Sequence, residues 1–169
     1  MDALKTIHTR RSIRKYQKKK IPAELIEKIL RAGMAAPSAH NEQPWHFVVV
    51  TDKKTLTLAS KISPYAAMIE EAPLAILVCG DLNLERGRVK GFWIQDCAAA
   101  VQNMLLAAAA LGLGAVWTGI YPAENLVGGH RQLFGLPENI IPFALAAFGY
   151  PAEKPAEQDR FKPERVRYN

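Results

Sequence analysis

The sequence predicts a layered α/β fold in which one sheet lies between helices. Two observations support this prediction. Segments with helical and strand-like patterns alternate along the chain, and the strand-like segments are short apolar runs rich in β-branched residues. The 169 residues, 49% hydrophobic and 22% charged, suit one globular domain over residues 1–169. Alternation of this kind favours parallel strands.

The first predicted elements are a helix, a strand and a second helix. Apolar residues at helical spacing, with a proline before them, predict an amphipathic helix over residues 23–35. An apolar run rich in valine predicts a buried strand over residues 46–50. Thr51 or Asp52 can then cap a helix through Lys61.

The middle of the chain holds the longest predicted element. Pro64 begins an irregular connection, and a second apolar run predicts a buried strand over residues 74–79. A helix follows over residues 92–111 and ends at Gly112. Its polar residues share one narrow stripe, which comprises Gln95, Asp96, Gln102 and Asn103. Alanines and leucines cover the rest, so we expect this helix to be central and almost wholly buried.

Two more strands and a helix complete the predicted sheet and its cover. The strands lie near residues 115–120 and 141–148 and flank a helix around residues 124–133. A charged tail that contains prolines follows over residues 155–169.

The positive charge of the chain is confined to one segment. The formal net charge is +6, yet residues 1–20 alone carry +7. A basic arm that binds nucleic acid is one interpretation, and its affinity would fall steeply with salt. Aromatic residues hardly interleave the arm and the remainder is close to neutral, so we expect no nucleic-acid partner.

The sequence indicates a cytoplasmic protein with no membrane association. The N-terminus lacks the apolar run and cleavage site of a secretory signal. The most apolar stretch, residues 104–117, suits a core helix better than a membrane span. Cys79 and Cys97 are too few and too widely spaced for a disulfide framework or a metal knuckle, so both are expected in the core.

Three guanidinium groups and a hydroxyl lie close together near the N-terminus. They belong to Arg10, Arg11, Ser12 and Arg14. Arginine binds phosphate through two parallel hydrogen bonds, and a serine hydroxyl can share the same oxygens. The segment can therefore hold a dianionic phosphate, although a solvated helix end explains it equally well.

A polar loop over residues 36–45 separates the first predicted helix from the first strand. Its Asn41 and Gln43 amides offer donor and acceptor together, which suits the edge of a heterocycle with imide and carbonyl groups. The alternative is an ordinary turn, because asparagine and serine are common turn formers.

Residues 112–122 contain several glycines but do not match a dinucleotide fingerprint. Trp117 occupies the third glycine position, and the order is helix then strand. Gly119 could let the backbone approach a ligand ring, or it could simply mark a turn. The four histidines show no metal-ligand spacing and no hydrolase motif is present, so we expect no metal and no nucleophilic residue.

Four segments together resemble the nitroreductase family of FMN-dependent oxidoreductases. They are RRSIRKY, APSAHNEQPWHFVVV, WIQDCAAAVQNMLLAAAALGLGAVW and DRFKPERVRYN, and they occur in family order over nearly the whole chain. The resemblance implies an α+β fold with three αβα layers and a mixed, mainly antiparallel sheet. It also implies a homodimer that buries the long helix, and a tail over residues 155–169 that extends onto the partner.

The resemblance also assigns roles to residues around FMN. Arg10, Arg11, Ser12 and Arg14 would bind the phosphate and ribityl chain. Pro37, Ser38, Asn41 and Gln43 would reach the flavin of the partner subunit. Trp117, Thr118 and Gly119 would lie along the ring near N5, while Arg160 and Lys162 match a basic pair that meets the phosphate.

The implied activity is ping-pong reduction of nitroaromatics, quinones or flavins by NADH or NADPH. The redox chemistry takes place at flavin N5, so no catalytic side chain is expected. Larger family members have inserted helices over the active site. We expect this short chain to lack them, so its acceptor pocket should be open. An alternative within this chemistry is an FMN-binding protein that supplies or consumes reduced flavin.

Overall fold

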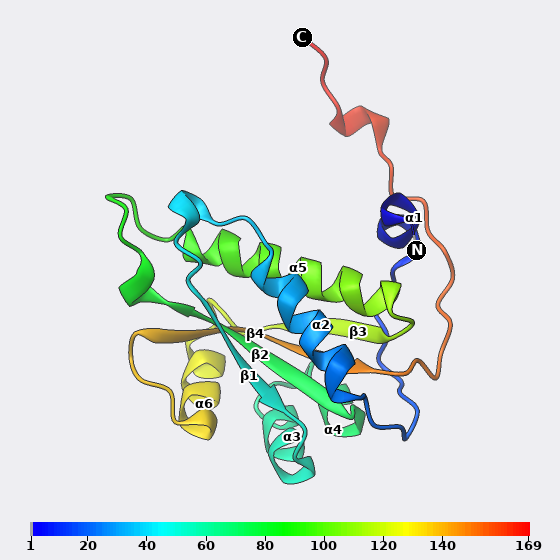
Figure 1. Ribbon diagram of the computed structural model, residues 1–169, viewed down its shortest axis with the longest axis horizontal. Coiled ribbons are helices and arrows are strands. Elements are labelled where there is room, and N and C mark those ends of the chain that lie inside the picture. Colours follow the sequence, from blue (N-terminus) through cyan, green and yellow to red (C-terminus); the bar gives the residue numbers. More distant parts are fainter. Residues whose placement is uncertain (1) are drawn as a thin grey trace.

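A four-stranded antiparallel sheet lies at the centre of the structure, a computed structural model that describes residues 2–169 (Figure 1). Its strands are β1 (Trp45–Val50), β2 (Leu74–Asp81), β3 (Gly114–Gly119) and β4 (Ile140–Gly149). They follow the order β1-β2-β4-β3, and each neighbouring pair is antiparallel. The expectation of parallel strands from the alternation is therefore wrong, and the mainly antiparallel sheet implied by the resemblance is confirmed.

The position of β4 explains why the alternation of helices and strands misleads. Strands β2 and β3 both pair antiparallel with β4, so they run in the same direction, as strands joined by a crossover helix usually do. The last strand, β4, lies between them and separates them. The other edge of β3 makes one parallel contact, an isolated bridge between Ser12 and Ala115. The sheet is thus mixed at that edge.

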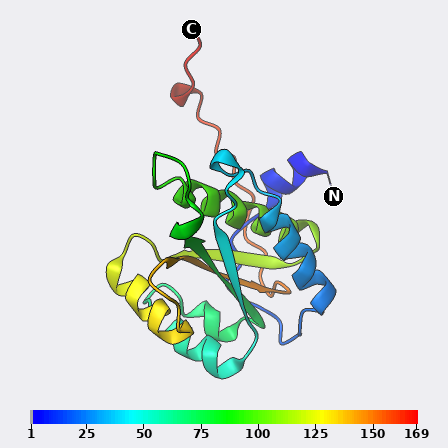
Figure 2. The ribbon, with the colours of Figure 1, turned by 60° about the vertical axis from the view of Figure 1, so that its left-hand side comes forward.

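Helices cover both faces of the sheet and produce three layers (Figures 1 and 2). One face carries α2 (Ala23–Met34) and α5 (Trp93–Ala110), and the other carries α3 (Lys53–Ser60), α4 (Met68–Glu71) and α6 (Glu124–Phe134). Strand β2 is buried on both sides. Its Ile76 and Val78 join the core under α2 and α5, whereas Leu77 and Cys79 join the opposite core, as the two-residue period of a strand requires.

Two short helices are absent from the sequence prediction. Helix α1 (Ala3–Thr9) begins where the Asp2 carboxylate accepts a hydrogen bond from the Lys5 N–H at 3.0 Å. Helix α4 has only four residues and lies within the connection expected to be irregular.

The polar stripe that the sequence predicts on α5 is only partly exposed. Asp96 belongs to that stripe in sequence, yet its side chain is buried.

The chain after β4 runs along α1 and away from the sheet (Figures 1 and 2). Nearly all of its side chains are exposed, including the large apolar Phe161, Val166 and Tyr168. In the described part of the chain, every helix is too short or too polar to cross a bilayer.

Buried His130 makes the folded state sensitive to acid. The side chain is 1% exposed, its Nδ1 lies 2.8 Å from the Leu126 carbonyl oxygen, and its Nε2 has no partner among residues 2–169. Burial lowers the pKa of His130 below its ordinary value near 6.5, which outweighs the opposing effect of the Leu126 carbonyl.

We therefore expect the free energy of unfolding to fall as pH drops below about 6.5, because His130 then binds a proton in the unfolded chain but not in the folded chain. For one group the slope cannot exceed about 1.4 kcal/mol per pH unit. Urea unfolding between pH 7 and pH 5 measures it. His130→Phe should flatten this dependence, and an equally steep dependence in that variant would contradict the assignment.

Candidate functional site

An extended N-terminal segment places the predicted phosphate-binding side chains beside β3. The Ile13 N–H donates to the Ala115 carbonyl at 3.0 Å. Gly114 permits this approach, because a Cβ there would lie 2.7 Å from the Ile13 side chain. Ile13 points into the core, so the alternation of an extended chain directs Arg10, Ser12 and Arg14 to the other side.

The end of α1, the arginines and the C-terminal tail enclose a hollow of about 540 Å³, here called the arginine hollow. Arg10, Arg11 and Arg160 all line it. Burial lowers the pKa of the Arg10 guanidinium, and the neighbouring Arg160 and Arg11 charges lower it further. Glu157 and Asp159 also line the hollow, so the side formed by the arginines is the part whose guanidinium donors suit a dianionic phosphate.

The predicted basic residues are not equivalent in the structure. The Arg11 guanidinium donates to the backbone carbonyls of His8, at 2.7 Å, and of Ala156, at 3.1 Å. It thereby ties the tail to the end of α1. Lys162 is exposed and does not line the arginine hollow, unlike Arg160. Arg10 and Arg160 are therefore the guanidinium groups best placed for a ligand.

A second hollow, of about 300 Å³, lies where β3 ends and is here called the strand-end hollow. It is lined by Arg14, Ser63, Tyr65, Met68, Val116, Trp117, Thr118, Gly119 and Leu126. The parallel bridge of Ser12 with Ala115 explains why Arg14 reaches Trp117, since the two segments advance side by side. The Thr118 hydroxyl donates to the Leu145 carbonyl at 2.6 Å, so this side chain is already occupied within the sheet. Gly119 is exposed, and a Cβ there would meet nothing within 4 Å.

The polar loop over residues 36–45 is held in a strained conformation. His40, Asn41 and Gln43 have φ values of 53°, 54° and 50°, which non-glycine residues rarely adopt. Side-chain contacts support this shape: the Gln43 N–H donates to Ser38 Oγ at 3.0 Å, and Gln43 Nε2 donates to Asn41 Oδ1 at 2.9 Å. Pro37 is exposed at the start of the loop. Side chains fixed in this way are ready to meet a ligand.

Asp96 anchors this loop to α5. Its Oδ1 accepts a hydrogen bond from the Ala39 N–H at 3.0 Å, while Oδ2 is buried with no partner in the described part of the chain. Burial raises the pKa of the Asp96 carboxyl, and the nearby Glu42 and Glu85 raise it further against the opposing Ala39 hydrogen bond. The sequence places Asp96 only in a polar stripe, so its contact with the loop is a structural finding.

One chain does not bring the loop and the arginines together. Asp96 meets the loop in the first turn of α5, whereas Ala109, in its last turn, shares a hollow with Arg10 and Arg11. At about 1.5 Å of rise per residue these two ends lie about 20 Å apart. The turn at residues 39–41 and α1 accordingly lie at opposite ends of α5 in Figure 1. The predicted site residues thus form two separate groups in the monomer.

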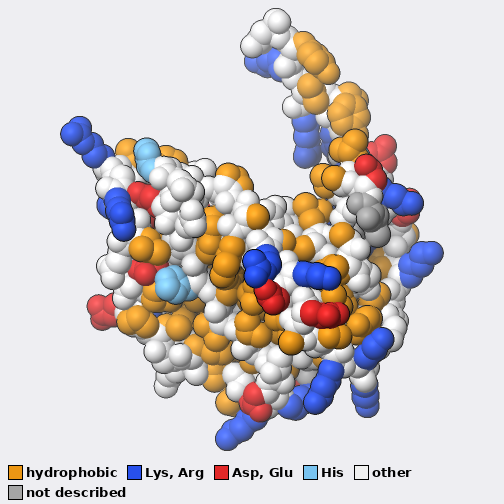
Figure 3. Space-filling model, viewed as in Figure 1, with side chains coloured by type: hydrophobic (Ala, Val, Ile, Leu, Met, Phe, Trp, Pro, Cys, Tyr) orange, Lys and Arg blue, Asp and Glu red, His pale blue; other side chains and the backbone are white. Residues whose placement is uncertain are grey.

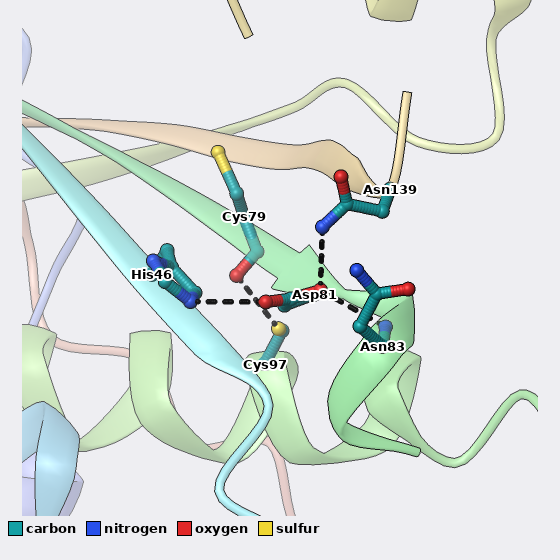
Figure 4. Close-up of polar contacts among 6 residues, drawn as sticks. All are labelled: His46, Cys79, Asp81, Asn83, Cys97 and Asn139. Carbon is teal, nitrogen blue, oxygen red and sulfur yellow. Dashed lines mark hydrogen bonds and ion pairs between the residues drawn. The ribbon is translucent and has the colours of Figure 1, made fainter. Parts of the chain in front are cut away.

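A polar cluster at the end of β2 belongs to neither group (Figure 4). The Asp81 carboxylate accepts from the Asn83 N–H at 2.9 Å and from Asn139 Nδ2 at 2.8 Å, and it lies 3.4 Å from His46 Nε2. Cys97 Sγ contacts the Cys79 carbonyl oxygen at 3.5 Å. Both thiols are buried, and burial raises the pKa of Cys79 to about 12. Their predicted place in the core is confirmed.

Comparison with known proteins gives a consistent result. The family model described as "Nitroreductase family" matches residues 7–69 and 59–150. A "Putative NADH dehydrogenase/NAD(P)H nitroreductase" of Methanothermobacter thermautotrophicus is 55% identical over 166 residues, which cover 98% of this chain and 86% of that protein. A solved structure with the same description, from Bacteroides thetaiotaomicron, shares 44% identity and has a TM-score of 0.93, with 99% and 96% of the two chains covered.

A third similar protein is described as dependent on FMN. The structure of an "FMN-dependent Nitroreductase" from Clostridium difficile has a TM-score of 0.91 at 27% identity, and 98% of each chain is covered. The superposition therefore covers nearly the whole of both chains. The chain belongs to the nitroreductase family.

Proposed function

We propose that this protein is an FMN-dependent oxidoreductase that takes electrons from NADH or NADPH and passes them to nitroaromatics, quinones or flavins by a ping-pong mechanism. The observation that carries the proposal is the pair of hollows along one extended segment. Arg10 and Arg160 converge in the arginine hollow, and Arg14 lies with Trp117 and Gly119 in the strand-end hollow. The first group suits a phosphate and the second an aromatic ring with polar edges.

The residues of one chain have distinct roles in this proposal. Arg10, Ser12 and Arg160 hold the phosphate, with Arg11 and Lys162 adding positive charge around it. Arg14 would hold the ring side of a bound FMN and supply positive charge there, because it lines the strand-end hollow. The backbone from Trp117 to Gly119 would line the ring near N5. When bound, FMN supplies the two-electron redox chemistry. Solvent delivers protons through the open strand-end hollow, so no acid or base residue is required.

A two-fold homodimer would complete the site, because it places the loop of one subunit at the hollows of the other. Pro37, Ser38, Asn41 and Gln43 would then contact the partner's flavin. The apolar groove on α1, α2 and α5 supports this assembly. It measures about 390 Å³ and is lined by Ala3, Thr6, Ile7, Ala32, Ala35, Asn103, Leu106, Ala107 and Ala110. Ile7, which lines the groove, and Met34 are 50% and 54% exposed in the monomer, so this face presents contiguous apolar surface to solvent.

The remaining features fit one domain over residues 1–169 in a reducing cytoplasm. Both cysteines are buried free thiols. The tail over residues 155–169 leaves Phe161 and Tyr168 70% and 90% exposed, so we propose that it packs on the partner subunit.

Anaerobic titration of the FMN-loaded protein tests the proposed activity. Excess NADH or NADPH should bleach the visible flavin absorbance, and a nitroarene or quinone added afterwards should restore it. Steady-state double-reciprocal plots at several acceptor concentrations should be parallel, as a ping-pong sequence requires. Flavin that stays oxidised with both nucleotides would refute the donor step.

A further inference from the structure

A second basic cluster lies at the opposite end of α5 from Arg10 and Arg160. Residues 85–91 form a loop that carries Arg86 and Arg88, both exposed. In the part of the chain that the structure describes, neither guanidinium lies within ion-pair distance of a carboxylate. Figure 3 shows Lys or Arg side chains and a histidine projecting from this corner of the molecule. The cluster is therefore open to an anionic ligand.

Arg86 faces a hollow shared with the polar loop. This loop hollow measures about 410 Å³ and is lined by His40, Asn41, Glu42, Arg86 and Gly87. No apolar side chain is among these residues, so the hollow suits a charged, hydrated group better than a ring. Asn41 is one of the residues proposed to meet the partner's flavin, which makes the loop hollow its immediate neighbour.

The nearby carboxylates are occupied by backbone donors. Glu42 Oε1 accepts hydrogen bonds from the Arg86 and Gly87 N–H groups, both at 2.7 Å. Burial acts to raise the pKa of Glu42, but these two hydrogen bonds, with His40 and Lys90 nearby, outweigh it and lower the pKa. Glu85 is buried and accepts from the Gly91 N–H at 2.9 Å. The acidic groups thus hold the loop in place, while the Arg86 and Arg88 guanidinium groups remain available.

The Glu42 contacts also fix the basic loop, residues 85–91, relative to the polar loop. Glu42 lies between Asn41 and Gln43 in sequence, so the position of Arg86 follows that of Asn41. In the proposed dimer the arginine hollow takes the phosphate of FMN at the far end of the site. A second cationic cluster beside Asn41, which is proposed to meet the partner's flavin, then fits a second phosphate-bearing molecule. The nicotinamide nucleotide is the phosphate-bearing substrate of the proposed reaction.

We infer that Arg86 and His40, with Arg88 adding positive charge from the same loop, bind the pyrophosphate of the nicotinamide nucleotide that reduces the partner subunit's flavin. This inference rests on the proposed function. NADH and NADPH both carry the pyrophosphate, so the site serves either donor. The acceptors lack phosphate, except for phosphorylated flavins, and a quinone does not use the site.

The experiment compares the FMN-loaded wild-type protein with Arg86→Ala/Arg88→Ala. We expect the KM for NADH and for NADPH to rise about tenfold or more, because hydrogen bonds between charged groups are lost. Flavin content and the KM for a quinone should not change. Inorganic pyrophosphate should compete with NADH in the wild type and do so at least about tenfold less well in the variant.

Lys18→Ala/Lys20→Ala is the matched control, because it removes the same charge from an exposed segment remote from the loop hollow. Its KM values should equal those of the wild type. Unchanged nucleotide KM values in the Arg86/Arg88 variant, with normal turnover, would overturn the inference alone. Loss of flavin from that variant would also overturn it. Failure of both nucleotides to reduce wild-type flavin would instead reject the proposed function.

Discussion

Arg10→Ala/Arg14→Ala should bind FMN about 10²–10⁴-fold more weakly than the wild type, since each charge-assisted hydrogen bond contributes about 1.5–3 kcal/mol. Arg10 lies beside Arg160 in the arginine hollow, and Arg14 lines the strand-end hollow, so the two changes act on the phosphate and the ring side together. Equilibrium dialysis of the apoprotein against FMN measures the effect.

Folding should be nearly unaffected by the same substitutions. Arg14 is exposed, and the Arg160 and Arg11 charges near Arg10 repel it, so removal of Arg10 relieves unfavourable contacts. Urea unfolding of the apoprotein should show a change within about 0.5 kcal/mol. Lys15→Ala/Lys18→Ala, two exposed lysines nearby, is the control and should keep wild-type FMN affinity. Equal FMN affinity in the arginine variant would remove these residues from the site.

The periodic elements of the fold are predictable from sequence, and the direction of the strands is not. Helix α5 and strand β2 are long and strongly apolar, and their observed bounds differ from the prediction by one or two residues. Helices α1 and α4 have seven and four residues, too few for a hydrophobic period to emerge. The direction of neighbouring strands depends on the position of β4 between β2 and β3. Tertiary packing sets that position, and local sequence patterns do not indicate it.

The residues of the candidate site are likewise only partly predictable from sequence. Arg10 and Arg160 can be proposed from residue type and family resemblance, and the structure brings both into one hollow. Asp96 meets Ala39 across 57 positions of sequence, so no short motif reveals that contact. Tyr65 and Met68 reach the strand-end hollow from a connection that has no regular pattern. Contacts of this kind arise from packing, and only coordinates show them.

The proposed division of the site between two subunits leads to a second large effect. Ala107→Glu should convert the proposed dimer to a monomer. FMN binding should weaken about 10²-fold although Arg10 and Arg14 are untouched, because hydrogen bonds from the partner's polar loop, each about 0.5–1.5 kcal/mol, are lost. Ala107 lines the apolar groove between α1, α2 and α5, so two symmetry-related glutamates would bury unpaired charge in the proposed interface. Glutamate is a good helix former, so α5 itself should tolerate the change.

Sedimentation velocity, circular dichroism and FMN dialysis on one preparation separate the outcomes. Ala23→Glu introduces the same side chain at an exposed position of α2 away from the groove and should remain a dimer with normal FMN affinity. A folded Ala107→Glu monomer with wild-type affinity would show that one chain alone holds the flavin. Weak binding by that monomer, with every arginine in place, would instead mean that the polar loop reaches FMN only from the neighbouring subunit, because nothing else in the arginine and strand-end hollows has changed.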